Sequence, residues 1–460
     1  MTLPKGPQTP ALLQMMHWIA RPFAFMETCA QRYGDVFTVS LGKHFAPIVF
    51  VSNPQALQEI LGSDSKQFDA PGEYNRLFEP LLGKQSVITV SGDRHRRQRQ
   101  LMMPPFHGER MRAYGQLISD ITEQVISQWE LGKPFSVRAS MQAISLRVIL
   151  GAVFGLHEGQ RYQQLEELLT SMLDVMSSPL SASMLYFPIL RQDLPLSPWR
   201  SFLRRQQQID QLIYAEIQER RDNPDDSRTD ILSLLMSARD EAGQPMTDVE
   251  LHDELMTLLV AGHETTATAL TWAFYWINKQ PTVREKLLEE LDTLGDRPDF
   301  NTIFRLPYLN AVCCETLRIY PVAMLTFPRV VKSPLSLMGY QLEPGTVVIG
   351  SIYLSHHRED VYPEPKQFKP ERFLERQFSP YEYVPFGGGS RRCLGMAFAQ
   401  FEMKVVLAKV LSQWELALAD NRPVEAVRRG LVSAPSDVRI VATGQRPQNS
   451  IMPQFSSSSV

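Results

Sequence analysis

The sequence predicts one large, mainly α-helical domain with a small β region. Short alternating segments bounded by Gly, Pro and Asn stand near its start, whereas segments with apolar residues at helical spacing fill most of residues 92–281. No linker, repeat period or run of like charge divides the 460 residues, and the hydrophobic content of 43% is typical of a globular protein. We therefore expect residues 1–445 to form a single domain built around a bound cofactor. The polar, low-complexity residues 446–460 should form a disordered tail.

The composition excludes several classes of protein. A net charge of −3 gives no reason to expect nucleic acid as a partner. The four cysteines, Cys29, Cys313, Cys314 and Cys393, lack the paired spacing of a zinc site and are too few for a disulfide framework, so we expect a reducing, cytoplasmic setting. The first residues contain no apolar stretch long enough to span a bilayer and no signal-peptide layout, so we expect no transmembrane anchor.

The elements follow in order along the chain. Residues 35–42 and 46–54 are β-rich and alternating, and we predict strands there. Helices are predicted over residues 111–132, 163–176, 201–222 and 247–281. The last of these is the longest and most apolar, begins with a capping signal at Thr247 and Asp248, and ends at Pro281. A helix that is apolar on most sides belongs in the middle of a large fold.

The remaining part alternates between helix, strand and loop. A helix over residues 306–321 stops at Pro321, and residues 334–352 read as strands and turns. Residues 357–392 form a long irregular segment, which is uncommon in a compact domain unless it is functional. It leads into a clear helix over residues 393–416.

Cys393 follows a glycine-rich turn at the mouth of that last helix. Backbone N–H groups and the positive end of a helix favour a thiolate over a thiol. The segment 386–395, FGGGSRRCLG, places Cys393 where such donors are expected. Taken alone, the residue is better explained as an inert packing cysteine in a turn, because most cysteines are inert packing groups.

The segment 261–266, AGHETT, brings two titratable side chains into the long apolar helix. Burial of such groups costs free energy unless they are satisfied, which raises the weight of a functional role. We predict that role for Glu264 and Thr265, and we expect His263 to lie on the one wet face of the helix.

Two charged groupings have ordinary interpretations when taken alone. Glu315 and Arg318 are spaced i, i+3 on one helix, as in many surface pairs. The basic cluster comprises Arg94, His95, Arg96, Arg97 and Arg99, and a solvated helix face is its usual explanation.

Together these segments resemble the cytochrome P450 family, in particular its soluble bacterial haem-thiolate monooxygenases. The match to Phe-x-x-Gly-x-Arg-x-Cys-x-Gly falls on Phe386, Gly389, Arg391, Cys393 and Gly395. The resemblance implies that Cys393 is the axial ligand to the haem iron, that Phe386 packs beside the sulfur, and that Arg391 pairs with a haem propionate. A thiolate ligand pushes electron density onto iron and so favours cleavage of the O–O bond.

AGHETT resembles the oxygen-activating segment of the same family. By that resemblance Ala261 and Gly262 face the haem, and Gly262 leaves room for dioxygen beside the iron. Thr265 would bond back to the carbonyl of Ala261 or offer its hydroxyl to oxygen. Glu264 would relay protons, which is a general-acid task.

Further family motifs assign the charged groups. With FKPERF at 368–373, the resemblance implies a buried structural triad of Glu315, Arg318 and Arg372 that locks the cysteine loop against the core. His95 and Arg99 match a family spacing that supplies propionate contacts, and Arg329 is a third candidate, because Arg recognises carboxylates in bidentate fashion.

The motifs stand in family order over nearly the whole chain. They imply the cytochrome P450 fold, with haem b between the long central helix and the helix after Cys393. The intact AGHETT favours O2-dependent monooxygenation over a peroxide-driven or isomerase-type enzyme and over a non-catalytic haem-thiolate sensor. No flavin or nicotinamide domain fits in the sequence, so a ferredoxin or flavodoxin with its reductase should deliver electrons to a monomer.

The substrate is expected to be lipophilic. Ile88, Ala323, Met324 and Leu325 match positions that the family aims at the haem, and with Ala261 they predict an apolar pocket. The apolar, Pro-punctuated segment 176–199 could cover an access path or simply pack on the core. The start, LPKGPQTP, resembles that of fatty-acid hydroxylases, and we expect long-chain fatty acids or terpenoids as substrates.

Overall fold

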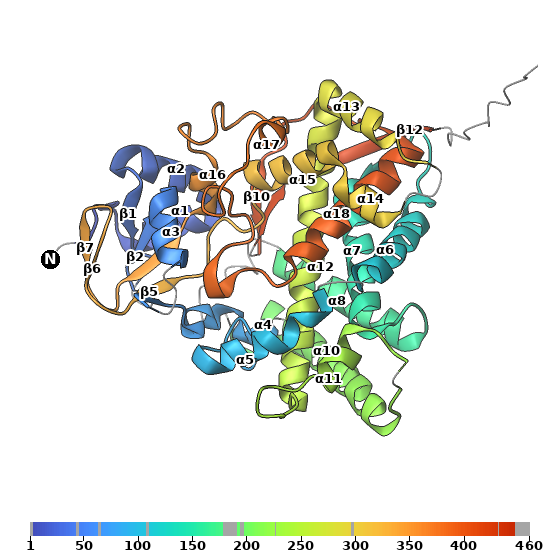
Figure 1. The fold of residues 1–460 in the computed structure, drawn as a ribbon, viewed down its shortest axis with the longest axis horizontal. Helices are drawn as coiled ribbons and strands as arrows, with labels where there is room; N and C mark the ends of the chain where they lie inside the picture. The colour runs from blue at the N-terminus through green and yellow to red at the C-terminus, as the bar shows by residue number, and fades with distance from the viewer. Residues whose placement is uncertain are drawn as a thin grey trace, which may run out of the picture.

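The computed structural model describes residues 3–42, 46–62, 66–106, 110–177, 191–193, 197–225, 227–295, 299–430 and 432–446. Helices make up most of these residues, and the strands form small sheets (Figure 1). This confirms the predicted fold class. Most of the segment 176–199 and all of the predicted tail beyond residue 446 lie outside the described residues.

The helices have the following bounds. In the first part of the chain they are α1 (Ala11–Ala20), α2 (Pro22–Tyr33), α3 (Pro54–Gly62), α4 (Glu79–Leu82), α5 (Gly92–Met102), α6 (Arg110–Ile126), α7 (Val137–Phe154) and α8 (Gln160–Ser177). The next are α10 (Pro198–Asp222), α11 (Ile231–Ser237), α12 (Asp248–Lys279), α13 (Pro281–Leu291), α14 (Phe300–Arg305) and α15 (Pro307–Ile319). The last are α16 (Ile352–His356), α17 (Arg372–Glu375) and α18 (Met396–Gln413), and short 3-10 turns span Gly72–Phe78, Pro104–Phe106 and Gly389–Arg391.

The strands form one larger sheet and three small ones. The larger sheet has the order β1 (Val36–Val39), β2 (Ile48–Val51), β8 (Val347–Gly350), β5 (Arg329–Val331) and β3 (Phe68–Asp69). The others pair β4 (Pro134–Ser136), β12 (Arg439–Gln445) and β9 (Trp414–Leu418), then β10 (Ala426–Arg429) with β11 (Val432–Pro435), and β6 (Leu335–Leu337) with β7 (Tyr340–Leu342). In the larger sheet β1 runs antiparallel to β2, with Phe37 opposite Phe50, and β2 runs parallel to β8. The strands β1, β2, β5, β6 and β7 lie to one side of the helical body, and β10 lies near its middle (Figure 1).

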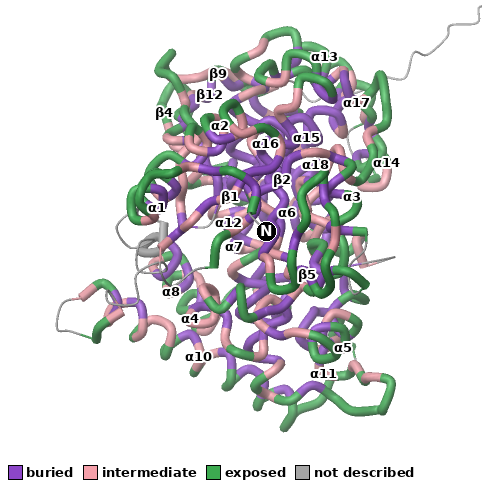
Figure 2. The backbone as a smooth tube through the Cα atoms, turned by 90° about the vertical axis from the view of Figure 1, so that its left-hand side faces the viewer, coloured by how far each residue is buried: buried purple, intermediate pink, exposed green. Residues whose placement is uncertain are grey.

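Helix α12 is the centre of the fold. Thr247 and Glu250 form a reciprocal capping box at its start, because the Glu250 N–H donates to the Thr247 hydroxyl at 3.2 Å and the Thr247 N–H to the Glu250 carboxylate at 2.9 Å. It ends just before Pro281, as predicted. Helices α7, α10, α15 and α18 pack against it, and Figure 2 shows the buried backbone concentrated around α12, α15 and α18. The predicted central helix is therefore confirmed.

The N-terminal region departs from the prediction of strands among turns. The predicted strands are present as β1 and β2, but three helices, α1, α2 and α3, surround them. Helix α1 buries Met15 and Trp18 but exposes Leu12, Leu13 and Met16, so apolar residues on both faces conceal its periodicity in the sequence. Among the described helices, α7 alone is long and apolar enough to cross a bilayer, and 67% of Val137–Phe154 is buried inside the protein, as expected for a core helix.

Candidate active site

The cysteine loop is a tight turn that runs into α18. Gly387 and Gly389 both adopt φ of +65°, in the left-handed region that side chains with a Cβ rarely enter. The Gly387 N–H donates to the carbonyl of Val384 at 3.1 Å, and the Cys393 N–H donates to the carbonyl of Phe386 at 3.0 Å. Gly395 is the N-cap of α18, so Cys393 stands two residues ahead of a helix start.

The Cys393 thiol lies inside the fold but faces open space. The residue is exposed, although the chain encloses it on its other sides. That enclosure removes water and raises the pKa of the thiol, while the Gly395 N–H and the guanidinium groups of Arg99 and Arg392 act to lower it. These three groups favour a thiolate without outweighing desolvation. A positive ion on the open side would complete the stabilisation, so the residues fit a metal centre bound to sulfur.

The middle of α12 borders open space as well. Ala261 is exposed and Val260 and Thr265 are partly exposed, in a helix whose other central residues are mostly buried. The Thr265 hydroxyl donates to the carbonyl of Ala261 at 2.5 Å, as predicted. Since α18 packs against α12, the exposed thiol and this apolar stretch belong to the interior of the same helical body.

Glu264 points away from that open stretch, toward α7. Its carboxylate forms an ion pair with Arg138 and accepts a hydrogen bond from the Gln142 amide at 3.1 Å. Both partners lie on α7, a helix that was not predicted separately from the sequence. The available signal was a charged and an amide side chain, Arg138 and Gln142, at i, i+4 spacing on one helix.

One prediction about AGHETT is wrong. His263 does not lie on a wet face: it is buried, its Nδ1 has no hydrogen-bond partner among the residues that the structure describes, and desolvation lowers its pKa to about 3. At Gly262, which is partly exposed, a Cβ would stand 2.8 Å from the Ile149 side chain of α7. Its missing side chain allows the close approach of α7 and α12. The Gly262 carbonyl accepts a hydrogen bond from Ser145 at 3.2 Å.

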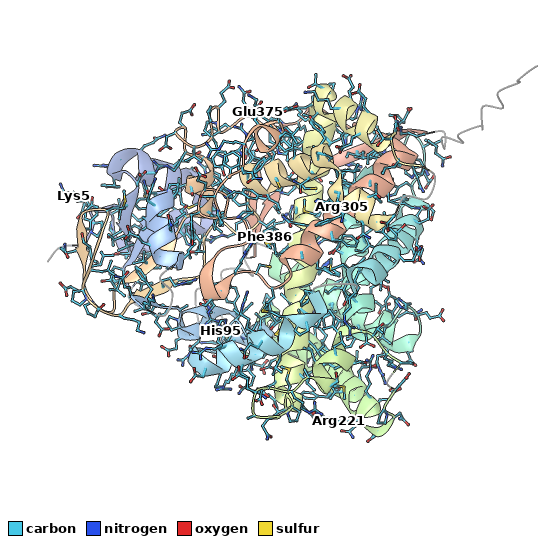
Figure 3. All side chains as sticks on the ribbon, viewed as in Figure 1. Lys5, His95, Arg221, Arg305, Glu375 and Phe386 are labelled. Carbon is cyan, nitrogen blue, oxygen red and sulfur yellow. The ribbon has the colours of Figure 1, made fainter. Side chains whose placement is uncertain are left out.

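The predicted propionate-binding groups gather around the cysteine loop. Arg99 donates to the carbonyl of Arg392 at 2.6 Å, and fully buried Arg329 donates to the carbonyls of Phe327 and Gly388 at 2.9 and 3.0 Å. His95 is buried on α5, and Figure 3 shows it below Phe386, toward the middle of the molecule.

Arg391 ties the cysteine loop to residues 83–90, the loop that precedes α5. Its guanidinium donates to the carbonyls of Ala70, Val87 and Val90 at 2.6 to 2.7 Å. With Arg99 and Arg329, this side chain gives the site a concentration of positive charge suited to an anionic cofactor edge.

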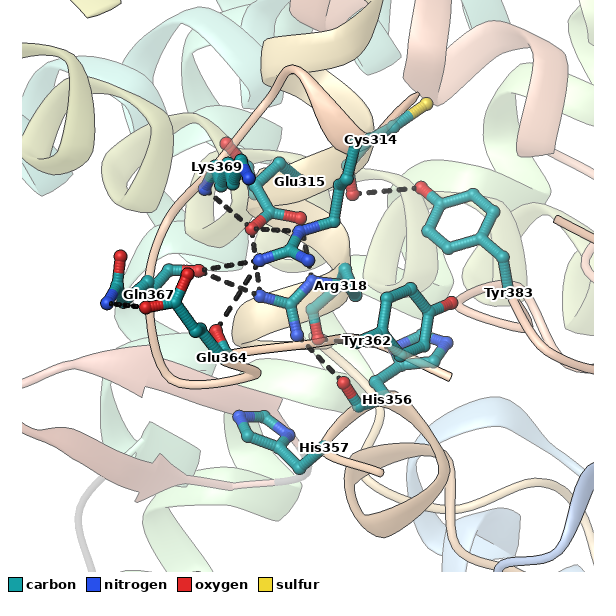
Figure 4. A network of polar contacts seen from close by, with 12 residues as sticks. Cys314, Glu315, Arg318, His356, His357, Tyr362, Glu364, Gln367, Lys369 and Tyr383 are labelled. Carbon is teal, nitrogen blue, oxygen red and sulfur yellow. Dashed lines mark hydrogen bonds and ion pairs between the residues drawn. The ribbon is translucent and has the colours of Figure 1, made fainter. Parts of the chain in front are cut away.

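The predicted structural triad forms. The Glu315 carboxylate accepts bonds from Arg318 at 2.6 and 2.8 Å, from Arg372 at 3.1 Å, and from the Lys369 N–H at 2.8 Å (Figure 4). Glu315 and Arg318 are 0% exposed and Arg372 is 5% exposed. Arg318 also donates to the carbonyl of His356 at 2.8 Å. The triad therefore anchors the irregular segment before the cysteine loop to α15.

The four predicted substrate positions fall into an exposed group and a buried group. Ile88 is partly exposed and Ala323 is exposed, so both have surface available for a ligand. Met324 is only 5% exposed and packs in a cluster with Trp18 and Phe50, so its prediction as a pocket residue is wrong. Leu325 is partly buried against the same cluster. After Pro321 the side chains alternate between exposed and buried positions, and no periodicity in the sequence predicted this alternation.

Two buried carboxyl groups were missed. Glu254 on α12 and Glu402 on α18 are fully buried, and none of their carboxylate oxygens has a hydrogen-bond partner among the described residues. Desolvation raises the pKa of Glu254 well above its usual value and that of Glu402 to about 8. The available signal was a charged residue at a core position of an apolar helix.

Comparison with known proteins identifies the family. The model of the family "Cytochrome P450" matches residues 4–441. A Mycobacterium tuberculosis protein named "Putative cytochrome P450 135B1" is 37% identical over 420 residues, covering 91% of this chain and 86% of that protein. "Putative cytochrome P450 138" from Mycobacterium bovis is 32% identical and covers 95% of both chains.

Solved structures share the fold. One described as "Retinoic acid bound cyanobacterial CYP120A1" has a TM-score of 0.82 at 24% identity and covers 96% of this chain and 100% of that one. The haem domain of cytochrome P450DA has a TM-score of 0.83 at 21% identity, covering 97% and 98%. Fold and site thus define a haem-thiolate protein. The chain belongs to the cytochrome P450 family, whose cofactor is haem b and whose general activity is monooxygenation.

Proposed function

We propose that this chain is an O2-dependent monooxygenase that hydroxylates a long-chain fatty acid, a terpenoid or a similar lipophile. The observation that carries the proposal is the Thr265 hydroxyl, bonded to the Ala261 carbonyl on the open stretch of α12, in the same helical body as the exposed Cys393 thiol. Bound haem b supplies oxygen activation, and a thiolate ligand favours O–O cleavage.

Cys393 would hold the iron, with Phe386 packed beside its sulfur. Arg99, Arg329, Arg391 and His95 would meet the propionates. The positive charge of the three arginines suits the two carboxylates of a haem, and guanidinium groups bind carboxylates in a fixed fork geometry. Three of them also contact backbone carbonyls around the cysteine loop, so the groups that would bind the propionates also order the loop.

Thr265 and Glu264 would deliver the proton that oxygen activation requires. The Thr265 hydroxyl can redirect its hydrogen from the Ala261 carbonyl toward a polar atom in the open space. The Glu264 carboxylate is held by Arg138 and Gln142, so its part in a relay requires a rotation of its side chain away from α7. The presence of both the Glu264 carboxyl group and the Thr265 hydroxyl group favours O2-dependent chemistry over the peroxide-driven and isomerase alternatives.

The apolar surface bordering the open stretch supports a lipophilic substrate. Val260 and Ala261 contribute apolar surface from α12, and Ile88 from the loop before α5. Apolar walls with few polar groups are typical of sites for small lipophiles. Electrons would come from a ferredoxin or flavodoxin and its reductase, acting on a monomer.

Isotope labelling tests the reaction. Haem-loaded protein, supplied with a ferredoxin, its reductase and a fatty acid, should give product containing one atom from labelled O2. Equal product formation with peroxide in the absence of O2 would favour the peroxide-driven alternative.

A spectral titration tests the substrate class. Fatty acids or terpenoids should shift the haem to high spin as they displace the iron-bound water, whereas small polar compounds should not. Tight spin shifts from polar compounds alone would refute the apolar pocket.

A further inference from the structure

His252 joins two helices through its ring nitrogens. On α12 its Nδ1 lies 2.9 Å from the Asp253 carboxylate, and its Nε2 lies 2.9 Å from the carboxylate of Asp210 on α10. The ring is buried and stacks on Tyr214 of α10, with centroids 4.5 Å apart and planes 5° apart. Both ring nitrogens therefore face carboxylates, and both can donate only in the imidazolium form.

Asp253 extends this link to the loop at residues 83–90. Its second carboxylate oxygen accepts a hydrogen bond from the Gln85 N–H at 2.8 Å. Gly83 adopts φ of +84°, and a Cβ there would stand 2.1 Å from the Asp253 carboxyl carbon, so only glycine permits this approach. One turn further along α12, the Thr257 hydroxyl donates to the Ser86 hydroxyl at 2.7 Å.

The same loop reaches the cysteine loop at its other end. The carbonyls of Val87 and Val90 bind Arg391, two residues before Cys393, and Ile88 between them is partly exposed. A continuous set of hydrogen bonds thus runs from α10 through His252 and Asp253 to the loop that borders the proposed site.

The charges around His252 favour its protonated form. Asp210 and Tyr214 face it from α10, and Asp253 faces it from α12. Other charges nearby are already paired: Asp248 with Arg221, and Lys84 of the loop with Glu79. Burial acts to lower the pKa of His252, but the two aspartates outweigh it and raise the pKa to about 9.

We propose that His252, with Asp210 and Asp253, is a positioning group that clamps α10 to the loop at residues 83–90 and thereby slows the passage of ligands to and from the haem. The proposal rests on the proposed function only for the location of Ile88 beside the site. Because the raised pKa belongs to a cationic acid, the clamp is complete at neutral pH and is lost as pH rises through about 9.

Stopped-flow binding of 1-phenylimidazole to the ferric, haem-loaded protein tests the clamp. This probe reports by a Soret shift, needs no turnover, and stays neutral over the range from roughly pH 7.5 to pH 10.5. Its dissociation rate constant should rise about tenfold across that range, and a factor of ten corresponds to about 1.4 kcal/mol. Failure of the monooxygenase proposal would leave this readout intact, since it requires only bound haem.

Variants separate the clamp from general alkaline effects. His252→Gln should bind the probe with fast, pH-independent dissociation, and Asp210→Asn should move the pH step downward because one of the two carboxylates is gone. Tyr214→Phe should keep the step, which excludes titration of the tyrosine. His157→Gln, at an exposed histidine between α7 and α8, is the matched control and should behave as wild type.

Two results would overturn the proposal. One is a wild-type dissociation rate that stays flat over the whole pH range. The other is a His252→Gln protein that keeps the wild-type step. If His252→Gln does not yield haem-loaded protein, the Asp210→Asn variant tests the clamp instead, because the Asp210 side chain is partly exposed and its replacement should not prevent folding. A pH step that does not move in Asp210→Asn contradicts the clamp.

Discussion

Removal of the Glu315 carboxylate on α15 should destabilise the protein far more than removal of an exposed charged side chain from the segment before the cysteine loop. The carboxylate accepts hydrogen bonds from two buried guanidinium groups and from the Lys369 N–H. Glu315→Ala leaves Arg318 and Arg372 buried without their shared anion. Breaking a buried ion pair by removing one partner costs about 3–5 kcal/mol. Since whole domains are stable by only about 5–15 kcal/mol, little folded protein should survive.

Haem content and denaturant unfolding measure this loss. Glu315→Ala should yield little haem-loaded protein, and the fraction that folds should unfold at much lower denaturant than wild type. Glu375→Ala is the matched control, because Glu375 lies on α17 one turn after Arg372 but is exposed, and it should cost less than about 0.5 kcal/mol. Equal haem content and equal unfolding midpoints in the two variants would refute the reasoning.

Three further changes test other parts of the account. Thr265→Ala should keep haem binding but lower product formed per O2 consumed by roughly tenfold, with the electrons diverted to peroxide, and unchanged coupling would assign the proton to another group. Gly262→Ala should cost about 1–3 kcal/mol in unfolding free energy, because the new methyl meets Ile149, and Ile149→Ala in the same chain should recover part of that cost; no loss in the single variant would contradict the packing. Glu402 holds its proton to about pH 8 when folded but ionises near its ordinary pKa when unfolded, so wild-type stability should fall as pH rises between these values. Glu402→Gln should remove that dependence in denaturant titrations, and an unaltered slope would show that the carboxyl is already ionised in the fold.

Much of the fold and of the site was predictable because local signals agreed with the global structure. Thr247 and Pro281 bound the central helix in the sequence and in the structure alike. The glycines before Cys393 predicted a turn, and two of them have the positive φ that such a turn requires. Glu315 and Arg318 were placed together by helical spacing alone.

The remaining features depend on packing between distant segments. His263 was predicted on a wet face because the sequence of a helix shows its polar residues but not the neighbouring helix that covers them. In the structure α7 packs on α12, and His263 is buried. The close approach of Gly262 to Ile149 could not be predicted for the same reason, since Ile149 is distant in the sequence. The burial of Met324 in the core could not be predicted, because the turn after Pro321 has no periodicity that indicates which side chains point inward. The partners of Glu264 lie on α7, and one of the two partners of His252, Asp210, lies on α10, so charge spacing within α12 does not reveal them.

The carbonyl spectrum of the ferrous protein tests the central claim most directly. Haem-loaded wild-type protein should show the red-shifted Soret band that thiolate ligation produces on reduction and exposure to carbon monoxide. Cys393→His should lose both that band and monooxygenase turnover, while the matched variant Cys314→Ser, at a cysteine buried on α15, should keep the band. A Cys393→His protein that retains the red-shifted band and turnover would contradict the assignment of Cys393 as the ligand.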